Sequence, residues 1–130
     1  MIAFYLDSTS GLAPYLQLAQ QVKHALRLGH LHVGDQLPTV KEVAAEIAVN
    51  PNTVFKAYNH LEHEGLVASR PGQGTFVTQS LAQPFLRDQA LLRQRLVAWL
   101  RDAYAAGWDE ETIAALITTT LHDIATEGAA

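Results

Sequence analysis

The sequence predicts an α+β fold that is mainly helical: a small domain of three helices and one β-hairpin in residues 1–78, followed by a two-helix segment in residues 79–130. Three observations support this prediction. The 130 residues are 48% hydrophobic and 17% charged, which suits a folded core. Apolar residues recur at helical spacing, with one β-branched stretch between them. Four of the five prolines lie before residue 79, so the helices there are short.

Composition excludes several classes of protein. The chain has no cysteine, which rules out a disulfide scaffold, a thiolate zinc site and cysteine catalysis. It has no run of about eighteen apolar residues and no basic, apolar leader, so we expect a cytoplasmic protein without a membrane-spanning segment. The chain has nine Lys and Arg residues and thirteen Asp and Glu residues, and the resulting net charge of −4 argues against a generic nucleic-acid binder.

The first predicted helix begins at Pro14 and ends before Gly29. Proline suits the first helical turn, where a missing N–H costs nothing, and glycine suits the left-handed residue that follows the last turn. The apolar positions between them recur at spacings of three and four: Tyr15, Leu18, Ala19, Val22, Ala25 and Leu26.

Two further helices follow, joined by about four residues. Thr39 and Glu42 fit a capping box at the start of one helix, and Asn50-Pro51 fits an N-cap and first-turn proline at the start of the next. The buried stripe of this third helix is Val54, Ala57, Tyr58 and Leu61. After Gly65, strand-like Leu66–Arg70, the turn Pro71-Gly72-Gln73-Gly74 and strand-like Thr75–Thr78 predict a hairpin.

This order of elements predicts a winged helix-turn-helix, in which the third helix enters the major groove of DNA and the hairpin is the wing. The outward positions of the third helix are the candidate base and phosphate contacts: Asn52, Thr53, Phe55, Lys56 and Asn59. Among them Phe55 suits a thymine methyl group or a neighbouring element. At the wing, Gly72 and Gly74 allow close approach to a surface, while Arg70 and Gln73 supply donors.

Four motifs run in order between Pro14 and Val77. They are Leu37-Pro38-Thr39-Val40-Lys41-Glu42-Val43-Ala44, Val49-Asn50-Pro51-Asn52-Thr53-Val54, Leu61-Glu62-His63-Glu64-Gly65-Leu66-Val67 and Gly72-Gln73-Gly74-Thr75-Phe76-Val77. Together they resemble the GntR family of bacterial transcription regulators, and the chain's opening and short C-terminal part are similar to its YtrA subfamily. The resemblance implies a homodimeric repressor that binds a palindromic operator, often of transporter genes.

The resemblance also implies DNA contacts at particular positions. The family's contacts fall on Lys41 in the second helix, Asn50, Asn52, Thr53 and Lys56 in the third, and Gly72 in the wing. The family usually has arginine where Lys41 stands, so a bidentate fork is replaced by a point charge. Some branches have arginine at the positions of Pro51 and Phe55, so the operator sequence does not transfer.

The C-terminal segment contains two amphipathic stretches, from about Pro84 to Ala106 and from the N-cap Asp109 onwards. Two helices that together total about forty residues hold too little core to stand alone. We therefore expect them to pack on a second subunit as a four-helix dimer interface, the alternative being packing on residues 1–78 in a monomer. The predicted interface residues are Phe85, Leu92, Leu96, Trp99, Leu100, Trp108, Ile113, Leu116, Ile117, Leu121 and Ile124.

Two other functions compete with operator binding. The pairs His30 with His32 and His60 with His63 suit part of a zinc or nickel site in a metal-sensing regulator, but no ligand-spaced carboxylate cluster accompanies them and no metal site is predicted. A winged helix can also dock on protein, which the net charge favours, whereas the polar outward face of the third helix favours DNA. No catalytic or phosphate-binding motif is present, so we expect neither an enzyme nor a cofactor. The sequence identifies no effector and does not distinguish activation from repression.

Overall fold

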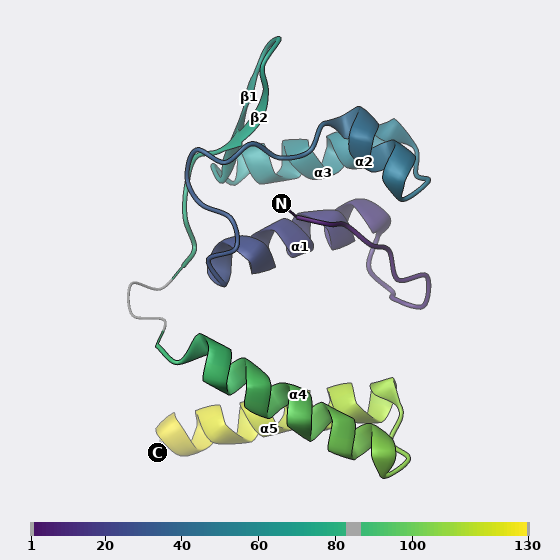
Figure 1. The fold of residues 1–130 in the computed structure, drawn as a ribbon, viewed down its shortest axis with the longest axis vertical. Helices are drawn as coiled ribbons and strands as arrows, with labels where there is room; N and C mark the ends of the chain where they lie inside the picture. The colour runs from purple at the N-terminus through teal and green to yellow at the C-terminus, as the bar shows by residue number, and fades with distance from the viewer. Residues whose placement is uncertain (1, 83–86, 130) are drawn as a thin grey trace. The chain divides into compact units, whose positions relative to one another are not determined.

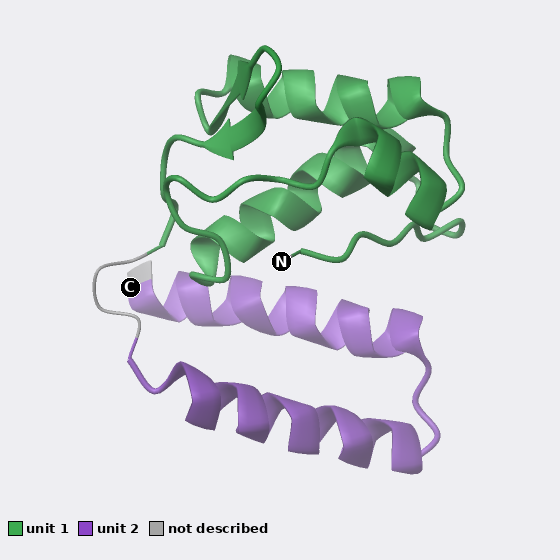
Figure 2. Cartoon of the chain, turned by 45° about the horizontal axis from the view of Figure 1, so that its top comes forward, with its two compact units in different colours: residues 1–86 green, residues 87–130 purple. Residues whose placement is uncertain are grey.

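The computed structural model describes residues 2–82 and 87–129, which form two compact units, Met1–Leu86 and Arg87–Ala130 (Figure 2). The elements in chain order are α1 (Pro14–Arg27), α2 (Val40–Glu46), α3 (Pro51–His63), β1 (Val67–Arg70), β2 (Gly74–Val77), α4 (Gln89–Ala105) and α5 (Glu110–Ala129) (Figure 1). The mainly helical class with one two-stranded sheet is therefore confirmed. Among these residues no helix combines the length and apolarity that a membrane crossing requires.

One hydrophobic core holds the first unit together. Helix α3 lies against both α1 and α2, and its predicted inner stripe is buried. The Tyr58 hydroxyl on this stripe donates to the Pro38 carbonyl at 2.6 Å, and burial raises the pKa of the phenol well above its ordinary value. The largest fully buried side chains are Leu18, Leu26, Leu37, Leu61, Val22, Val43 and Val54. Each contributes about 1.5–3 kcal/mol, so the core determines which face of α3 points outward.

The predicted caps of α2 and α3 form, except for one of the two hydrogen bonds of the capping box. The Thr39 hydroxyl accepts the Glu42 N–H at 3.1 Å, and the Asn50 side chain accepts the Asn52 N–H at 2.9 Å. The returning half of the capping box, from Thr39 N–H to the Glu42 carboxylate, does not form between these two described residues. The Glu42 side chain is exposed to solvent instead.

The N-terminal segment adds a feature that the sequence analysis missed. Phe4 is buried in the core, and two glutamines one turn apart on α1 bind the segment's backbone. Gln21 accepts the Tyr5 N–H at 3.1 Å and donates to the Tyr5 carbonyl at 2.8 Å, and Gln17 does the same for Asp7 at 2.8 and 3.1 Å. The two carboxamides thus replace the neighbouring strand that this extended segment lacks.

The wing has a third strand-like edge. The β1–β2 register places Ser69 opposite Thr75 and Arg70 opposite Gly74. On the other side of β2, residues 34–37 pair with it through an isolated bridge between Gln36 and Phe76. The backbone bonds of this edge are Gly34 N–H to Val77 O at 2.9 Å, Val77 N–H to Asp35 O at 2.8 Å and Leu37 N–H to Thr75 O at 2.8 Å. A lone hairpin is marginally stable, so this edge attaches the wing to the domain.

The second unit is a pair of helices. Asp109 caps α5 as predicted, since its carboxylate accepts the Thr112 N–H at 2.8 Å. Helix α4 begins at Gln89, later than the predicted start near Pro84, and the predicted interface residue Phe85 lies outside the described residues. The buried hydrophobic residues in the described part of this unit are Ala103 and Ile113. The pair therefore has very little core of its own.

Candidate nucleic-acid interface

The exposed ridge of α3 carries the predicted contact residues. Asn52, Phe55, Lys56 and Asn59 are exposed, and Thr53 is half-buried. They lie outside because the buried stripe occupies the opposite positions of the same helix. Phe55 is 58% exposed. The ridge is mostly polar, with one basic side chain and one large apolar side chain.

Lys56 is oriented by an aromatic side chain on α1. Its ammonium nitrogen lies 4.3 Å from the centroid of the Tyr15 ring. Together with Pro14, Asn52 and Thr53 these two residues line a small hollow of about 210 Å³. An exposed cation–π contact of this kind is worth about 0.5–1 kcal/mol. Tyr15 therefore restrains the lysine without neutralising its charge.

The C-terminal end of α3 is tied to α1 by an ion pair. Lys23 Nζ lies 2.7 Å from the Glu64 carboxylate, and His60 Nε2 lies 3.0 Å from it. The hydrogen bond from Lys23 lowers the pKa of Glu64, and His60 adds to this effect. The His60 ring also meets Tyr15 edge-to-face, with centroids 6.1 Å apart. This acid is therefore paired within the protein.

A groove of about 420 Å³ separates α3 from the wing. Its lining brings together five residues predicted from different segments: Phe55 of α3 with Arg70, Gly72, Gln73 and Gly74 of the wing. Across the groove, the Glu62 carboxylate accepts the Ser69 N–H at 2.6 Å, a bond that attaches β1 to α3. The Arg70 guanidinium lies 4.7 Å from the centroid of the Phe76 ring, which supports it from within the wing.

The two glycines of the wing have different roles in the structure. Pro71 and Gly72 occupy the centre of a tight turn, closed by the Gln73 N–H to Arg70 carbonyl bond at 2.9 Å, and Gly72 has the positive φ of +75° that a type II turn requires. Gly74 has φ +126°, and a Cβ there would lie 2.5 Å from Nε2 of Gln36. The prediction placed Gly74 at the DNA surface, but a contact inside the protein already explains a glycine at this position.

Two further predicted contact residues, Lys41 and Asn50, are both exposed. Lys41 is exposed on α2, and Asn50 is exposed at the N-cap of α3. Because the side-chain oxygen of Asn50 caps the helix, its NH₂ group is the part that can donate to a DNA partner.

The second unit presents an apolar surface. Residues of both helices line a hollow of about 320 Å³, namely Leu96, Trp99, Leu116, Ile117, Thr120 and Leu121. Leu121 is 65% exposed and Ile124 60%. The described members of the predicted interface therefore include several large hydrophobic side chains that this unit leaves uncovered.

Two histidines lie against carboxylates within the described part of the chain. His60 pairs with Glu64, and His32 Nδ1 lies 3.6 Å from the Asp35 carboxylate. Among the described residues, no three His, Asp or Glu side chains are grouped so as to hold a metal ion.

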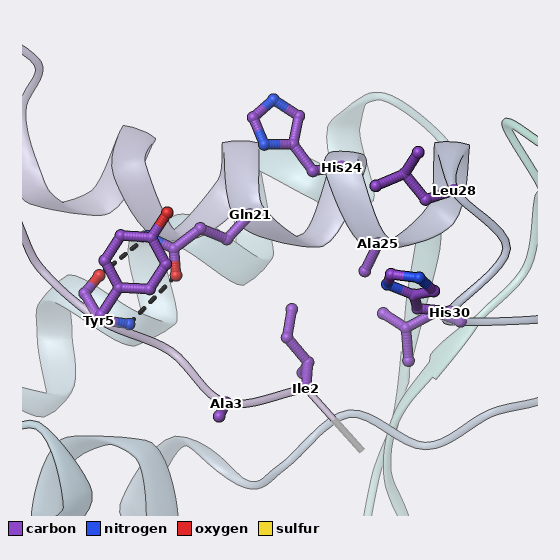
Figure 3. A pocket seen from close by; sticks show the side chains of 9 residues that line it. Ile2, Ala3, Tyr5, Gln21, His24, Ala25, Leu28 and His30 are labelled. Atoms are coloured by element: carbon purple, nitrogen blue, oxygen red, sulfur yellow. Dashed lines mark hydrogen bonds between the residues drawn. The ribbon is translucent and has the colours of Figure 1, made fainter. Parts of the chain in front are cut away.

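A further hollow of about 400 Å³ lies between the N-terminal segment and α1. Figure 3 shows Gln21 bonded to the Tyr5 backbone, with Ile2 and Leu28 among the apolar side chains of the wall and His24 and His30 along it. None of the predicted site residues lines it. It was missed because nothing in the local sequence indicates that the N-terminal segment docks on this helix.

Sequence reasoning also missed the contacts of three residues next to the predicted site residues. Tyr15 packs against the core as its place in the apolar stripe predicted, but its contact with Lys56 was not foreseen. Glu62 and Gln36 were not singled out, yet both bind the wing. A residue that acts through a contact distant in sequence leaves no local pattern, so periodicity and spacing do not reveal it.

Comparison with known proteins places this geometry in a family. Residues 14–77 match the family described as "Bacterial regulatory proteins, gntR family". The HTH-type transcriptional repressor YtrA of Bacillus subtilis (strain 168) is 34% identical over 109 residues, which cover 83% of this chain and 84% of YtrA. That length exceeds the first unit, so the similarity continues into the second unit.

Two solved structures show the same relationship. YtrA from Sulfolobus acidocaldarius, a GntR-family transcription factor, is 30% identical with a TM-score of 0.53, covering 71% of this chain and 94% of that one. The DNA-binding domain of AraR, solved with the operator ORX1, is 28% identical with a TM-score of 0.53, covering 58% of this chain and 95% of that one. The predicted resemblance is therefore confirmed: the chain belongs to the GntR family of bacterial regulatory proteins and is a DNA-binding transcriptional regulator.

Proposed function

We propose that the protein is a homodimeric repressor that binds a palindromic operator. In this proposal each protomer places α3 in the major groove of one half-site and its wing along the adjacent backbone or minor groove. The observation that carries it is the exposed ridge of α3, with Asn52, Lys56 and Asn59, next to the groove that leads to Arg70 and the wing tip. Two relatives add support, since B. subtilis YtrA is a repressor and the AraR DNA-binding domain was solved with an operator.

The uncovered apolar face of α4 and α5 supports the dimer. Large side chains such as Leu96, Trp99 and Leu121 are exposed there, whereas the described core of the unit is limited to Ala103 and Ile113. A second copy of the same face covers such a surface most simply, because a two-fold axis pairs it with itself. The result is a four-helix arrangement made of two helices from each protomer.

The charge of the interface sets its salt dependence. Each protomer presents three basic side chains on the proposed DNA-facing elements, Lys41, Lys56 and Arg70. A dimer then neutralises about six phosphates, which corresponds to a slope of log K against log salt of about −5. Non-specific binding is expected to be weak, and affinity depends on backbone N–H contacts and base readout.

Selection of duplexes from a random pool tests the proposal. The expected product is an inverted repeat whose half-sites are spaced by about 10–10.5 base pairs or a multiple of this. Recovery of unrelated sequences, or of a single unpaired half-site, would contradict it. If the enriched sequence also occurs upstream of transporter genes, it supports the expectation from the YtrA resemblance that the repressor controls such genes.

A pair of matched variants tests the dimer. Leu121→Asp adds a charge to the proposed interface, and Thr118→Asp adds the same charge to an exposed position on the same helix. In sedimentation at micromolar concentration, we expect the first variant to shift towards monomer and the second to remain dimeric. A Leu121→Asp protein that sediments like the unmodified chain would mean that this face is not the interface.

A chain truncated after Thr78 is expected to bind operator much more weakly, because the link between the two half-sites is lost.

A further inference from the structure

A side chain outside the hairpin, that of Gln36, binds the wing tip, in addition to the Glu62 carboxylate that binds β1 at Ser69. Gln36 lies on the edge segment that pairs with β2, directly opposite Phe76. Its side chain extends past Phe76 towards the tip, where Nε2 donates to the Gln73 carbonyl at 3.0 Å. This bond lies beyond the last backbone bond of the edge, Leu37 N–H to Thr75 O. It therefore restrains the part of the wing that the backbone ladder leaves projecting.

Gly74 makes room for this bond. Residues 74 and 76 of β2 share a face with Arg70 and Ala68, their partners on β1. Because Gly74 has no side chain, Gln36 crosses it from one side, and a Cβ there would meet the carboxamide at 2.5 Å. Arg70, opposite Gly74 on the other side, leans over the Phe76 ring at 4.7 Å. The glycine thus lets an amide and a guanidinium converge on one face of the wing.

We propose that Gln36 is a positioning residue for DNA binding: through its bond to the Gln73 carbonyl it holds the wing tip, and with it Arg70, in the orientation that meets the operator. This inference rests on the proposed operator binding. Gln36 is itself uncharged and exposed, so its removal changes neither the net charge nor the buried core. Its effect on DNA is therefore separable from an electrostatic or folding effect.

The matched variants are Gln36→Met and Gln20→Met. Methionine keeps the length of the side chain and removes the amide donor, and Gln20 is an exposed glutamine of α1 away from the wing. The probe is the duplex enriched in the random-pool selection, titrated against the full chain. We expect Gln36→Met to weaken binding by about two- to tenfold, the range for one lost hydrogen bond, while the protein remains fully folded at the temperature of the assay. Gln20→Met is expected to bind like the unmodified protein.

Two readouts distinguish positioning from general loss of structure. With the tip released, the Arg70 phosphate contacts weaken in both protomers, and the salt slope should fall in magnitude from about 5 to about 3.5. Hydroxyl-radical protection should be lost at the flanks of the operator, where the wings lie, and retained in the central major-groove contacts. If affinity, slope and flank protection all match those of Gln20→Met, the inference is overturned while operator binding stands. If the unmodified protein enriches no duplex, the proposed function itself fails.

A double-mutant cycle gives an independent test. Gly74→Ala should weaken binding more in the unmodified chain than in a Gln36→Ala background, because truncation of Gln36 removes the atom that the new Cβ meets. The strain of a positive φ remains in both backgrounds, so it cancels. Additive effects on the logarithm of the dissociation constant would show that Gln36 and Gly74 are not coupled and would refute the proposal.

Discussion

The turn between α2 and α3 contains an alanine in a conformation that glycine normally takes. Ala48 has φ +53°, and the next residue closes the helix end through a Val49 N–H to Ala44 carbonyl bond of 3.1 Å. The helices α1 and α3 end in the same way at Gly29 and Gly65, both with φ +76°. We therefore predict that Ala48→Gly stabilises the protein.

The size of the effect follows from two opposing terms. An L-residue in the left-handed region costs about 1–2 kcal/mol relative to the right-handed one, and glycine avoids this cost. Glycine also gives the unfolded chain more freedom, which removes about 0.4–1 kcal/mol. The expected net gain is about 0.5–1 kcal/mol. For a unit of this size it corresponds to a rise of about 2–8 °C in the melting temperature.

Urea and thermal unfolding at a fixed protein concentration measure this gain, and Ala45→Gly is the matched control. Ala45 is an exposed residue inside α2, where glycine costs about 1 kcal/mol relative to alanine. The same substitution three residues apart is thus expected to have opposite signs. If Ala48→Gly destabilises the protein as Ala45→Gly does, the left-handed turn is wrongly assigned and so is the placement of α3 relative to α2.

The remaining predictions concern the core, the DNA contact and pH. Leu61→Ala, at a position with no exposed surface, should cost about 2–5 kcal/mol in urea unfolding through the cavity it leaves; a near-neutral result would mean that the buried stripe is misassigned. Lys56→Ala should weaken operator binding by about tenfold and reduce the salt slope by about 2 for the dimer, and an unchanged gel-shift titration would contradict the placement of α3. The lowered pKa of Glu64 means that its pairing with Lys23 stabilises the protein above the ordinary carboxyl pKa and is lost as pH falls through the folded value. Unfolding measured from pH 6 to pH 3 should therefore show an acid-side loss that is smaller in Lys23→Met.

Local pattern predicted the helices because each depends on its own sequence. The stripe from Val54 to Leu61 repeats at helical spacing, and the caps Asn50 and Asp109 precede their helices directly, so the structure agrees with them. The N-terminal segment and residues 34–37 were not predicted as parts of the fold, because each is defined by a partner distant in sequence. Phe4 shows no period that points to α1, and Gln36 shows none that points to β2.

The same distinction between local patterns and contacts distant in sequence applies to the candidate site. The identities of Lys56 and Arg70 suggested DNA contacts, but not the aromatic rings of Tyr15 and Phe76 that orient them. A cation over a ring depends on two backbones being brought together, and neither spacing nor composition records that. The start of α4 was placed too early for a related reason: the apolar period extends before Gln89, and an amphipathic pattern does not determine where helical hydrogen bonding begins.

The negative net charge is distributed in a way that accounts for binding to DNA. Residues 1–78 carry five basic and six acidic side chains, and residues 79–130 carry four and seven. Within the first part, Glu64 is paired with Lys23, and the Glu62 and Asp35 carboxylates accept backbone N–H groups at 2.6 and 2.8 Å. These bonds engage three of the six carboxylates of this part within the protein, whereas Lys41, Lys56 and Arg70 are exposed on the proposed DNA-facing elements. Three cations are few for one protomer, and because the two half-sites of a dimer are linked, their contributions multiply in the affinity. The weak charge is therefore an argument for the dimer rather than against DNA.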